Sequence, residues 1–203
     1  MVELSREQFP PLLLKRIDSA RTLLYNPRNY DNTGRNTLVI TMNHPFSLRV
    51  SNPEDHDFML RVYASTREDE LRLVDWDEAQ KQAFVQMQFE AQRQHYLITY
   101  PKAQYDVIEQ EGQPIGRMIV DRSENTILLV DIAILPEYRN AGIGTRLIED
   151  LLEEADRSHC SVQVHVEIFN PAMNLYKRLG FVKTGEISVY HEMTRLPKVR
   201  AYA

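Results

Sequence analysis

The sequence predicts a mixed α/β fold with an N-terminal helix–strand extension. Three β-rich segments, at 105–109, 115–120 and 126–135, are separated by turn signals and indicate a meander. The last of them is almost continuously apolar, as a central strand buried on both faces should be. An amphipathic helix at 143–156 and a strand at 161–167 follow, which together complete a strand–helix–strand crossover.

The composition is that of an ordinary globular protein. Of the 203 residues, 43% are hydrophobic and 26% are charged. The formal net charge of −5 disfavours a nucleic-acid or anionic-membrane partner and suits a cationic or amine-bearing one. The lone cysteine, Cys160, excludes a disulfide framework and a multi-cysteine zinc site, and the histidines lack metal-ligand spacing. No apolar run is long enough to span a bilayer, so a cytoplasmic protein is expected.

Residues 1–45 are predicted to be an appendage on a main domain that spans 46–203. Apolar residues at helical spacing predict a helix within 7–24, and the β-rich segment 37–41 predicts a strand. This arm would cover either a substrate site or a homodimer interface, and the sequence decides for neither.

Local signals predict the remaining elements of the main domain. Residues 46–50 alternate as a strand does, and Asn52-Pro53 caps a helix that continues through Val62. A second helix, from about Asp75 to His95, carries apolar residues near one face and six glutamines, which favour a solvated face over a substrate groove. The chain ends with a short helix and two strands, at 171–179, 181–187 and 189–195.

A glycine-containing turn joins the apolar strand to the next helix. Glycines at the start of a helix let backbone N–H groups point at an anion, to which the helix dipole adds attraction. Arg139 adds a fork of donors suited to phosphate oxygens, so a pyrophosphate is the natural ligand. A P-loop is excluded because Thr145-Arg146 follows Gly144 in place of a Lys-Ser/Thr pair, and Leu147 replaces the third glycine of the dinucleotide fingerprint. Taken alone, glycines that merely ease a tight turn are the alternative.

Two motifs carry a more specific signal together. The first is Ile132-Ala133-Ile134-Leu135-Pro136-Glu137-Tyr138-Arg139-Asn140-Ala141-Gly142-Ile143-Gly144. The second is Asn170-Pro171-Ala172 followed by Leu175-Tyr176-Lys177-Arg178-Leu179-Gly180-Phe181. In this order and separation they resemble the GNAT superfamily of N-acetyltransferases, over about residues 46–196. The resemblance implies a largely antiparallel central sheet flanked by helices. It also implies transfer of an acetyl group from acetyl-CoA, without a metal, to a primary amine by direct attack in a ternary complex.

The resemblance also assigns the cofactor-binding turn. Its residues would wrap the pyrophosphate of acetyl-CoA, although Asn140 and Ala141 replace residues that often add phosphate contacts. The implied turn residues are Arg139, Asn140, Ala141, Gly142, Ile143, Gly144 and Thr145.

The strand before the turn and the second motif complete the implied site. Ile134, with Ile132 and Ala133 before it, matches the strand whose backbone pairs with the pantetheine arm, and the Ile134 N–H would polarise the thioester carbonyl. Asn170 and Ala172 match positions that bind the cofactor arm. Tyr176 matches the usual general acid, which protonates the departing thiolate.

The base that removes the amine proton is left open. Leu128 occupies the position where some family members carry a glutamate. His165 and Glu167 alternate onto one face of their strand, and His165 falls where certain members place a base, although a partly solvated face explains both residues equally. Asp131 is unusual in an apolar strand and would serve as base, as amine anchor or as a structural hydrogen-bonding group. Water is a further alternative.

Two alternatives compete with a small-molecule acetyltransferase. One is a non-catalytic acyl-CoA-binding or regulatory module, which Leu128 favours and Tyr176 disfavours. The other is an enzyme that modifies a protein N-terminus or a lysine, for which an open groove is expected. Trp76, Phe89 and Tyr190 are the aromatic candidates for an acceptor pocket, although core packing is favoured for the first two.

Overall fold

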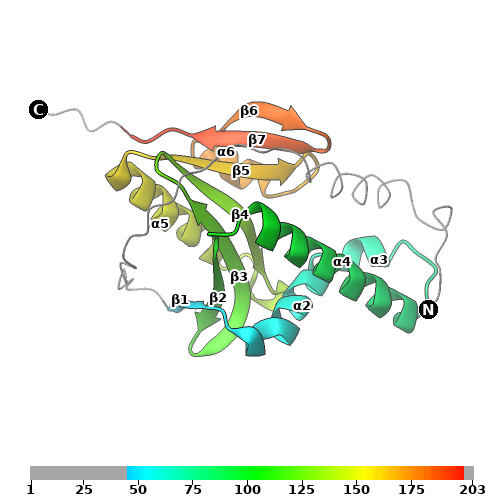
Figure 1. Ribbon diagram of the computed structural model, residues 1–203. Helices are drawn as coiled ribbons and strands as arrows, with labels where there is room; N and C mark the ends of the chain where they lie inside the picture. The colour runs from blue at the N-terminus through cyan, green and yellow to red at the C-terminus, as the bar shows by residue number, and fades with distance from the viewer. Residues whose placement is uncertain (1–44, 199–203) are drawn as a thin grey trace, which may run out of the picture.

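The computed structural model describes residues 45–198, so the helix predicted within 7–24 and the strand predicted at 37–41 lie outside the described residues. A seven-stranded sheet has the order β1-β2-β3-β4-β5-β7-β6 (Figure 1). Its neighbouring strands are antiparallel, apart from the parallel pair β4 and β5. This confirms the mixed α/β, largely antiparallel prediction, whereas the domain boundary at residue 45 stays a prediction.

The strands are β1 (Phe46–Val50), β2 (Gln104–Gln110), β3 (Gln113–Arg122), β4 (Thr126–Ile134), β5 (Ser161–Glu167), β6 (Val182–Ile187) and β7 (Tyr190–Arg195). The helices are η2 (Pro53–Asp55), α2 (His56–Ser65), α3 (Glu68–Leu71), α4 (Glu78–Thr99), η3 (Pro136–Tyr138), α5 (Ile143–Ser158) and α6 (Met173–Arg178).

The bounds of most elements follow the local signals, and α4 departs furthest from them. This helix begins directly after Asp77, which forms a capping box with Gln80 through N–H···O contacts of 2.8 and 3.0 Å. It continues beyond the predicted end at His95 to Thr99, and Pro101 prevents a further turn. The short α3 was not predicted because four acidic and apolar residues carry no periodicity.

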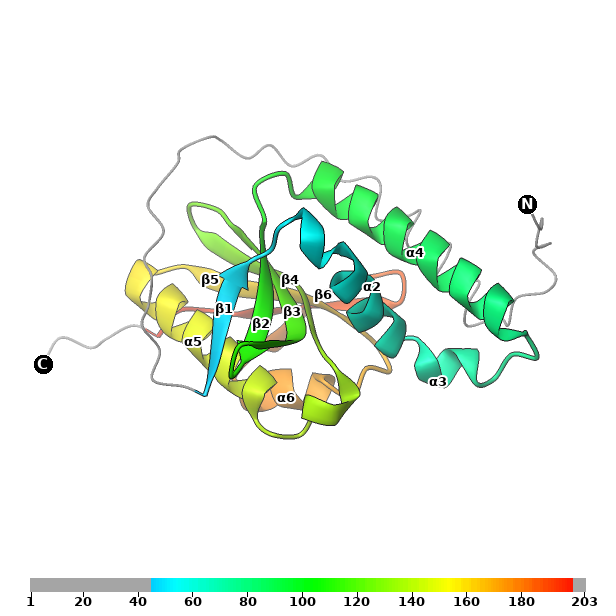
Figure 2. The ribbon, with the colours of Figure 1, turned by 90° about the horizontal axis from the view of Figure 1, so that it is seen from below.

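The sheet separates two helical layers (Figure 2). α5 and α6 pack on one face, where Val162, Val164 and Val166 of β5 enter the main apolar core. α2 lies on the other face, where Val62 contacts Ala133 of β4, and α4 packs against α2. The alternation predicted for β5 is therefore confirmed, and its polar residues face away from α5.

β4 and β5 separate partway along their length (Figure 1). Their parallel pairing extends over four residue pairs and ends at Leu129 and Val164. Val130 is the extra residue of a β-bulge, because Leu129 and Asp131 pair with consecutive residues of β3. The rest of β4, up to Ile134, pairs with β3 alone among the described strands. We refer to this region, in which β4 after Leu129 and β5 after Val164 run apart, as the β4/β5 divergence.

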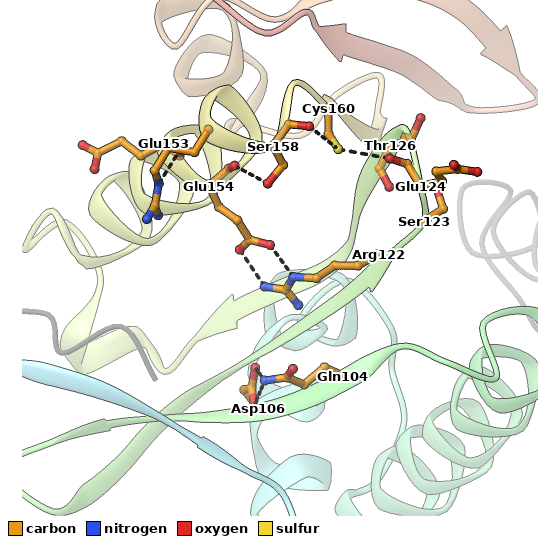
Figure 3. A network of polar contacts seen from close by, with 11 residues as sticks. Gln104, Asp106, Arg122, Ser123, Glu124, Thr126, Glu153, Glu154, Ser158 and Cys160 are labelled. Atoms are coloured by element: carbon orange, nitrogen blue, oxygen red, sulfur yellow. Dashed lines mark hydrogen bonds and ion pairs between the residues drawn. The ribbon is translucent and has the colours of Figure 1, made fainter. Parts of the chain in front are cut away.

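Polar contacts join α5 to the C-terminal end of β3. Figure 3 shows Arg122 of β3 donating from Nε and Nη2 to the Glu154 carboxylate of α5, at 2.6 and 3.0 Å. The Cys160 thiol donates to the carbonyl oxygens of Glu124 and Ser158, both at 3.5 Å. Burial raises the pKa of this thiol, which keeps it protonated and gives Cys160 a packing role.

Candidate functional site

The β4/β5 divergence exposes one edge of the β4 backbone. The Leu135 N–H donates to the Ile115 carbonyl of β3 at 2.9 Å. Because successive residues of a strand direct their backbone groups to opposite sides, Ala133 also faces β3, whereas Ile132 and Ile134 face the divergence. The Ala133 side chain packs against Val62. Of the three strand positions implied by the resemblance, Ile132 and Ile134 therefore offer backbone groups to a ligand, and Ala133 does not.

The turn after β4 points its N–H groups outward. Asn140 and Gly142 both have left-handed backbone angles, with φ of 62° and 82°, which turn the chain sharply into α5. The Arg146 N–H donates to the Gly142 carbonyl at 3.0 Å, the hydrogen bond that opens the helix. The N–H groups of Ile143, Gly144 and Thr145 therefore precede the first intrahelical bond and are available to an anion at the helix N-terminus.

Arg139 holds this turn against α2. Its Nε donates to the Ile134 carbonyl at 2.7 Å, and its Nη2 donates to the Ser65 carbonyl and hydroxyl at 3.2 and 3.1 Å. A guanidinium group at the last carbonyls of α2 is also favoured by the helix dipole. The sequence suggested a phosphate-binding fork, but the structure uses these donors for protein acceptors. Nε and Nη2 of Arg139 are therefore engaged within the protein, whereas the backbone N–H groups at the start of α5 are not.

The second motif builds the short helix α6. The Asn170 side chain accepts from the Ala172 N–H at 2.9 Å, the contact expected of a residue that caps the start of a helix, and α6 itself runs from Met173 to Arg178. Gly180, with φ of 88°, ends it in the left-handed conformation expected of a C-terminal glycine. Asn170 is exposed and Ala172 is half-buried. Both ends of α6 are thus fixed by local chemistry.

α6 buries Tyr176 beside the divergence. Tyr176 is 5% exposed, packs edge-on against Phe181 with 5.5 Å between ring centroids, and belongs to the apolar cluster that Ile132 and Ile134 contact. Burial, and secondarily the negative charge of Asp131, raises the pKa of the phenol well above its usual range. The hydroxyl therefore carries its proton at neutral pH and is competent to donate it.

Asp131 lies on the opposite face of β4, in an ion pair with a buried arginine. Its Oδ2 is 2.6 Å from Nε of Arg117, which is 3% exposed. Arg117 also donates from Nη2 to the Gln92 side chain at 2.9 Å, so this glutamine of α4 faces the sheet and not solvent. The contacts favour the structural role among those suggested for Asp131. The sequence analysis did not single out Arg117. The alternation of a strand predicts which face a side chain lies on, but it does not predict its ion-pair partner.

His165 lies immediately after Val164, the last residue of β5 that pairs with β4. Its Nε2 is 3.4 Å from Oε1 of Glu192 on β7, and both side chains are partly exposed. They line a polar cavity of about 340 Å³ formed by Gln163, Val164, His165, Thr184, Glu192, Met193 and Thr194. Glu167 is half-buried and pairs across the sheet with Tyr190. The structure thus brings His165 to a polar pocket formed by β5, β6 and β7.

The other aromatic candidates pack between helices. Trp76 lies edge-on to Phe84 at 5.2 Å between ring centroids, and the buried Phe89 contacts the ring of Tyr63 at 5.7 Å. Both are packing residues, as favoured from sequence. The part of the chain that the structure describes contains no cluster of three or more His, Cys, Asp or Glu that would hold a metal ion. None of its helices combines the length and the apolarity needed to cross a bilayer.

Comparisons with known proteins agree with this geometry. Residues 68–181 match the family model of the acetyltransferase (GNAT) family. An N-alpha-acetyltransferase of Sulfurisphaera tokodaii is 35% identical over 66 residues, which are 31% of this chain and 40% of that protein. A thialysine N-epsilon-acetyltransferase of Bos taurus is 30% identical over 99 residues, 42% of this chain and 58% of that protein. The chain therefore spans less than two thirds of the length of these curated relatives.

A solved structure shares the fold. PaiA N-acetyltransferase from Thermoplasma acidophilum, determined in complex with coenzyme A, superimposes with a TM-score of 0.58 over 74% of this chain and 98% of that one. Its sequence is 14% identical, so the likeness concerns the fold alone.

Proposed function

Because the chain belongs to the GNAT acetyltransferase family, we propose that it is an N-acetyltransferase that transfers the acetyl group of acetyl-CoA to a primary amine. The observation that carries the proposal is the conjunction of two features at the end of β4. A backbone edge left open by β5 leads directly into a turn whose N–H groups point outward at a helix N-terminus. In acetyl-CoA, the thioester and pantetheine arm would match the open backbone edge, and the pyrophosphate that follows would match the helix N-terminus.

The chain's own groups suit the binding of acetyl-CoA. The N–H groups of Ile143, Gly144 and Thr145, with the dipole of α5, would hold the pyrophosphate. The backbone groups of Ile132 and the N–H of Ile134 would hydrogen-bond the pantetheine arm along the divergence. Asn170, exposed at the start of α6, would contact the same arm from the other side.

Acetyl-CoA supplies an activated acyl carbon when it is bound, and the residues of the divergence would serve its transfer. The Ile134 N–H stabilises the negative charge that develops on the carbonyl oxygen when the amine nitrogen attacks. A base accepts the proton that the amine loses. As the carbon–sulfur bond breaks, Tyr176 donates its proton to the departing thiolate. The products are an N-acetyl amide and CoA.

His165 is our proposed base. We expect His165→Gln to lower kcat about 100-fold, within the range of general base catalysis. The matched control is Glu167→Gln, which changes the next residue on the same face of β5 and should leave kcat nearly unchanged. The measurement is CoA thiol release at saturating acetyl-CoA and acceptor. An unchanged kcat in His165→Gln would assign the proton to Glu167 or to water.

Thermal melting tests the function itself. A ligand at 100 times its dissociation constant stabilises a protein by about 2.7 kcal/mol. At about 2–4 °C per kcal/mol, saturating acetyl-CoA should raise Tm by several degrees. 3′-Phosphoadenosine 5′-diphosphate, which keeps the pyrophosphate and lacks the pantetheine arm, is the control and should shift Tm less.

An acceptor panel then separates the enzyme from a binding module. Peptides with free N-termini, lysine analogues and small alkylamines are screened by CoA release, because the relatives are named for N-alpha and N-epsilon transfer. A Tm shift without CoA release from any amine would favour a non-catalytic acyl-CoA-binding module. An unchanged Tm at saturating acetyl-CoA would remove both functions.

A further inference from the structure

A second cavity lies between the α2/α4 layer and the sheet. Its volume is about 610 Å³, within the size range of small-molecule sites. Its described lining residues come from β1, β2, β3, the start of α2 and the C-terminal half of α4. None of them belongs to β4, β5, α6 or the turn after β4, so the cavity is separate from the proposed acetyl-CoA site. Figure 2 shows α4 lying over α2 beside these strands.

The cavity exists because α4 rests on α2 and not directly on the sheet. Phe89 of α4 packs on Tyr63 of α2, with ring centroids 5.7 Å apart. Beyond this contact, toward the C-terminal half of α4, Gln92 reaches Arg117 of β3 by a single hydrogen bond of 2.9 Å. The apolar part of the cavity lining includes Phe89 of α4, Met59 of α2 and Ile119 of β3.

The basic side chains that line the cavity are His56, Arg93 and Arg117, and no acidic residue is among the described lining residues. Their carboxylate partners lie outside the lining. Glu90 is 2.8 Å from His56 Nε2 and accepts from Arg93 Nε at 3.0 Å, while Asp131 pairs with Arg117. The cavity wall therefore presents N–H donors and no carboxylate oxygen, which suits a hydrogen-bond-accepting or negatively charged group.

Tyr105 adds an unused donor at the same wall. Its hydroxyl is buried and has no hydrogen-bond partner within the described residues. The residue lies beside Ile119 in the register of β2 and β3 and lines the cavity. Burial raises the pKa of this phenol, and the nearby charges of Arg93 and Arg117 oppose the rise. A buried hydroxyl without a partner destabilises the folded protein, and a ligand acceptor would remove that cost.

We propose that this cavity binds a small amphipathic carboxylate, with its apolar body between α4 and the sheet and its carboxylate at the Tyr105 hydroxyl and the Arg93 guanidinium. The apolar walls supply most of the contact area with the ligand. The N–H and O–H donors favour a ligand with a carboxylate over one with an ammonium group. This second site is independent of the acetyl-transfer proposal, because it shares no residue with the acetyl-CoA site.

A charge-reversed ligand pair tests the proposal on the full-length protein. The probes are 2-naphthylacetate and 2-(2-naphthyl)ethylamine, which share an aromatic body, with octanoate as a linear carboxylate. Isothermal titration calorimetry should show binding of at least one carboxylate and at least about 10-fold weaker binding of the amine, as expected for a charge-assisted hydrogen bond worth about 1.5–3 kcal/mol. Acetyl-CoA binding is measured in parallel as a separate readout.

Two variants locate the bound carboxylate, and a third is the control. Tyr105→Phe should weaken its binding about 5-fold and Arg93→Gln about 10-fold, the usual values for neutral and charged hydrogen bonds. Arg72→Gln removes an exposed arginine of the α3 C-terminus, outside the cavity, and should change nothing. The proposal is overturned if no carboxylate binds at millimolar concentration, if the amine binds as well as the carboxylates, or if both cavity variants keep the affinity of the unmodified protein.

Discussion

Replacing Tyr176 by phenylalanine is expected to lower kcat by about 10²- to 10³-fold, while the dissociation constant of acetyl-CoA stays unchanged. The phenol is buried beside the divergence and keeps its proton at neutral pH, so it is positioned to donate when the thiolate departs. The variant retains the ring that packs on Phe181 and loses only the oxygen atom. The measurement pairs CoA release, with the best acceptor of the panel, with calorimetric binding of acetyl-CoA.

The matched control for this variant is Tyr63→Phe. Tyr63 is 2% exposed and lies on α2, on the opposite face of the sheet, so the same oxygen atom is removed from an equally buried ring. Its stacking against Arg67 and Arg117 survives, because the ring is kept. We expect kcat of this control to stay within about 2-fold of the unmodified protein, since one hydroxyl far from the reaction contributes little. Equal turnover of Tyr176→Phe and Tyr63→Phe would take Tyr176 out of the acid role.

Replacing Gly144 by aspartate is expected to weaken cofactor binding strongly without harming the fold. Two unit charges about 4 Å apart repel by about 4 kcal/mol at an effective dielectric constant of 20. A carboxylate beside the proposed pyrophosphate should therefore weaken acetyl-CoA binding at least about 100-fold, which corresponds to about 2.7 kcal/mol. The position has room, because an added Cβ would lie 3.6 Å from Ile134 Cδ1, an ordinary contact. An acidic residue in the first turn of α5 is also favoured by the helix dipole.

Gly144→Asn separates charge from size at the same position. It has nearly the shape of aspartate without the negative charge, so its acetyl-CoA affinity should lie well above that of Gly144→Asp. Melting without ligand should give equal or higher Tm for both variants than for the unmodified protein. If aspartate and asparagine weaken binding alike, the pyrophosphate does not lie at the N-terminus of α5.

Elements whose bounds are set by strand alternation or by glycines at helix ends were predictable from the sequence. β1 and β5 have the bounds that their alternation predicts, and α5 begins at Ile143 as the preceding glycine indicates. Gly180 ends α6 because a left-handed residue without a Cβ is the usual stop of a helix. The family resemblance was carried by the same kind of signal, since both motifs are turns into helices whose conformations need particular residues. These features depend on neighbours within a few positions along the chain.

Partners distant in sequence were not predictable in this way. Arg139 had the composition of a phosphate ligand, and only the approach of α2 to the turn gave its guanidinium the Ser65 acceptors. The sequence left Asp131 as a base, an amine anchor or a structural group, and only the pairing of β3 with β4 placed Arg117 2.6 Å from its carboxylate. The buried Tyr105 hydroxyl, likewise, gave no signal in the sequence of a β-strand.

The sequence by itself therefore determined the class of fold, the positions of the glycine turn and the short helix, and the chemistry that these two motifs share with a family. The tertiary structure alone decided which edge of β4 is open, because that depends on β5 separating from β4 after Val164 and on the bulge at Val130. It also decided which charged side chains are neutralised and which cavities remain. The physical reason is that local propensities act over single turns, whereas pairing, burial and charge neutralisation depend on segments that meet only when the chain is folded.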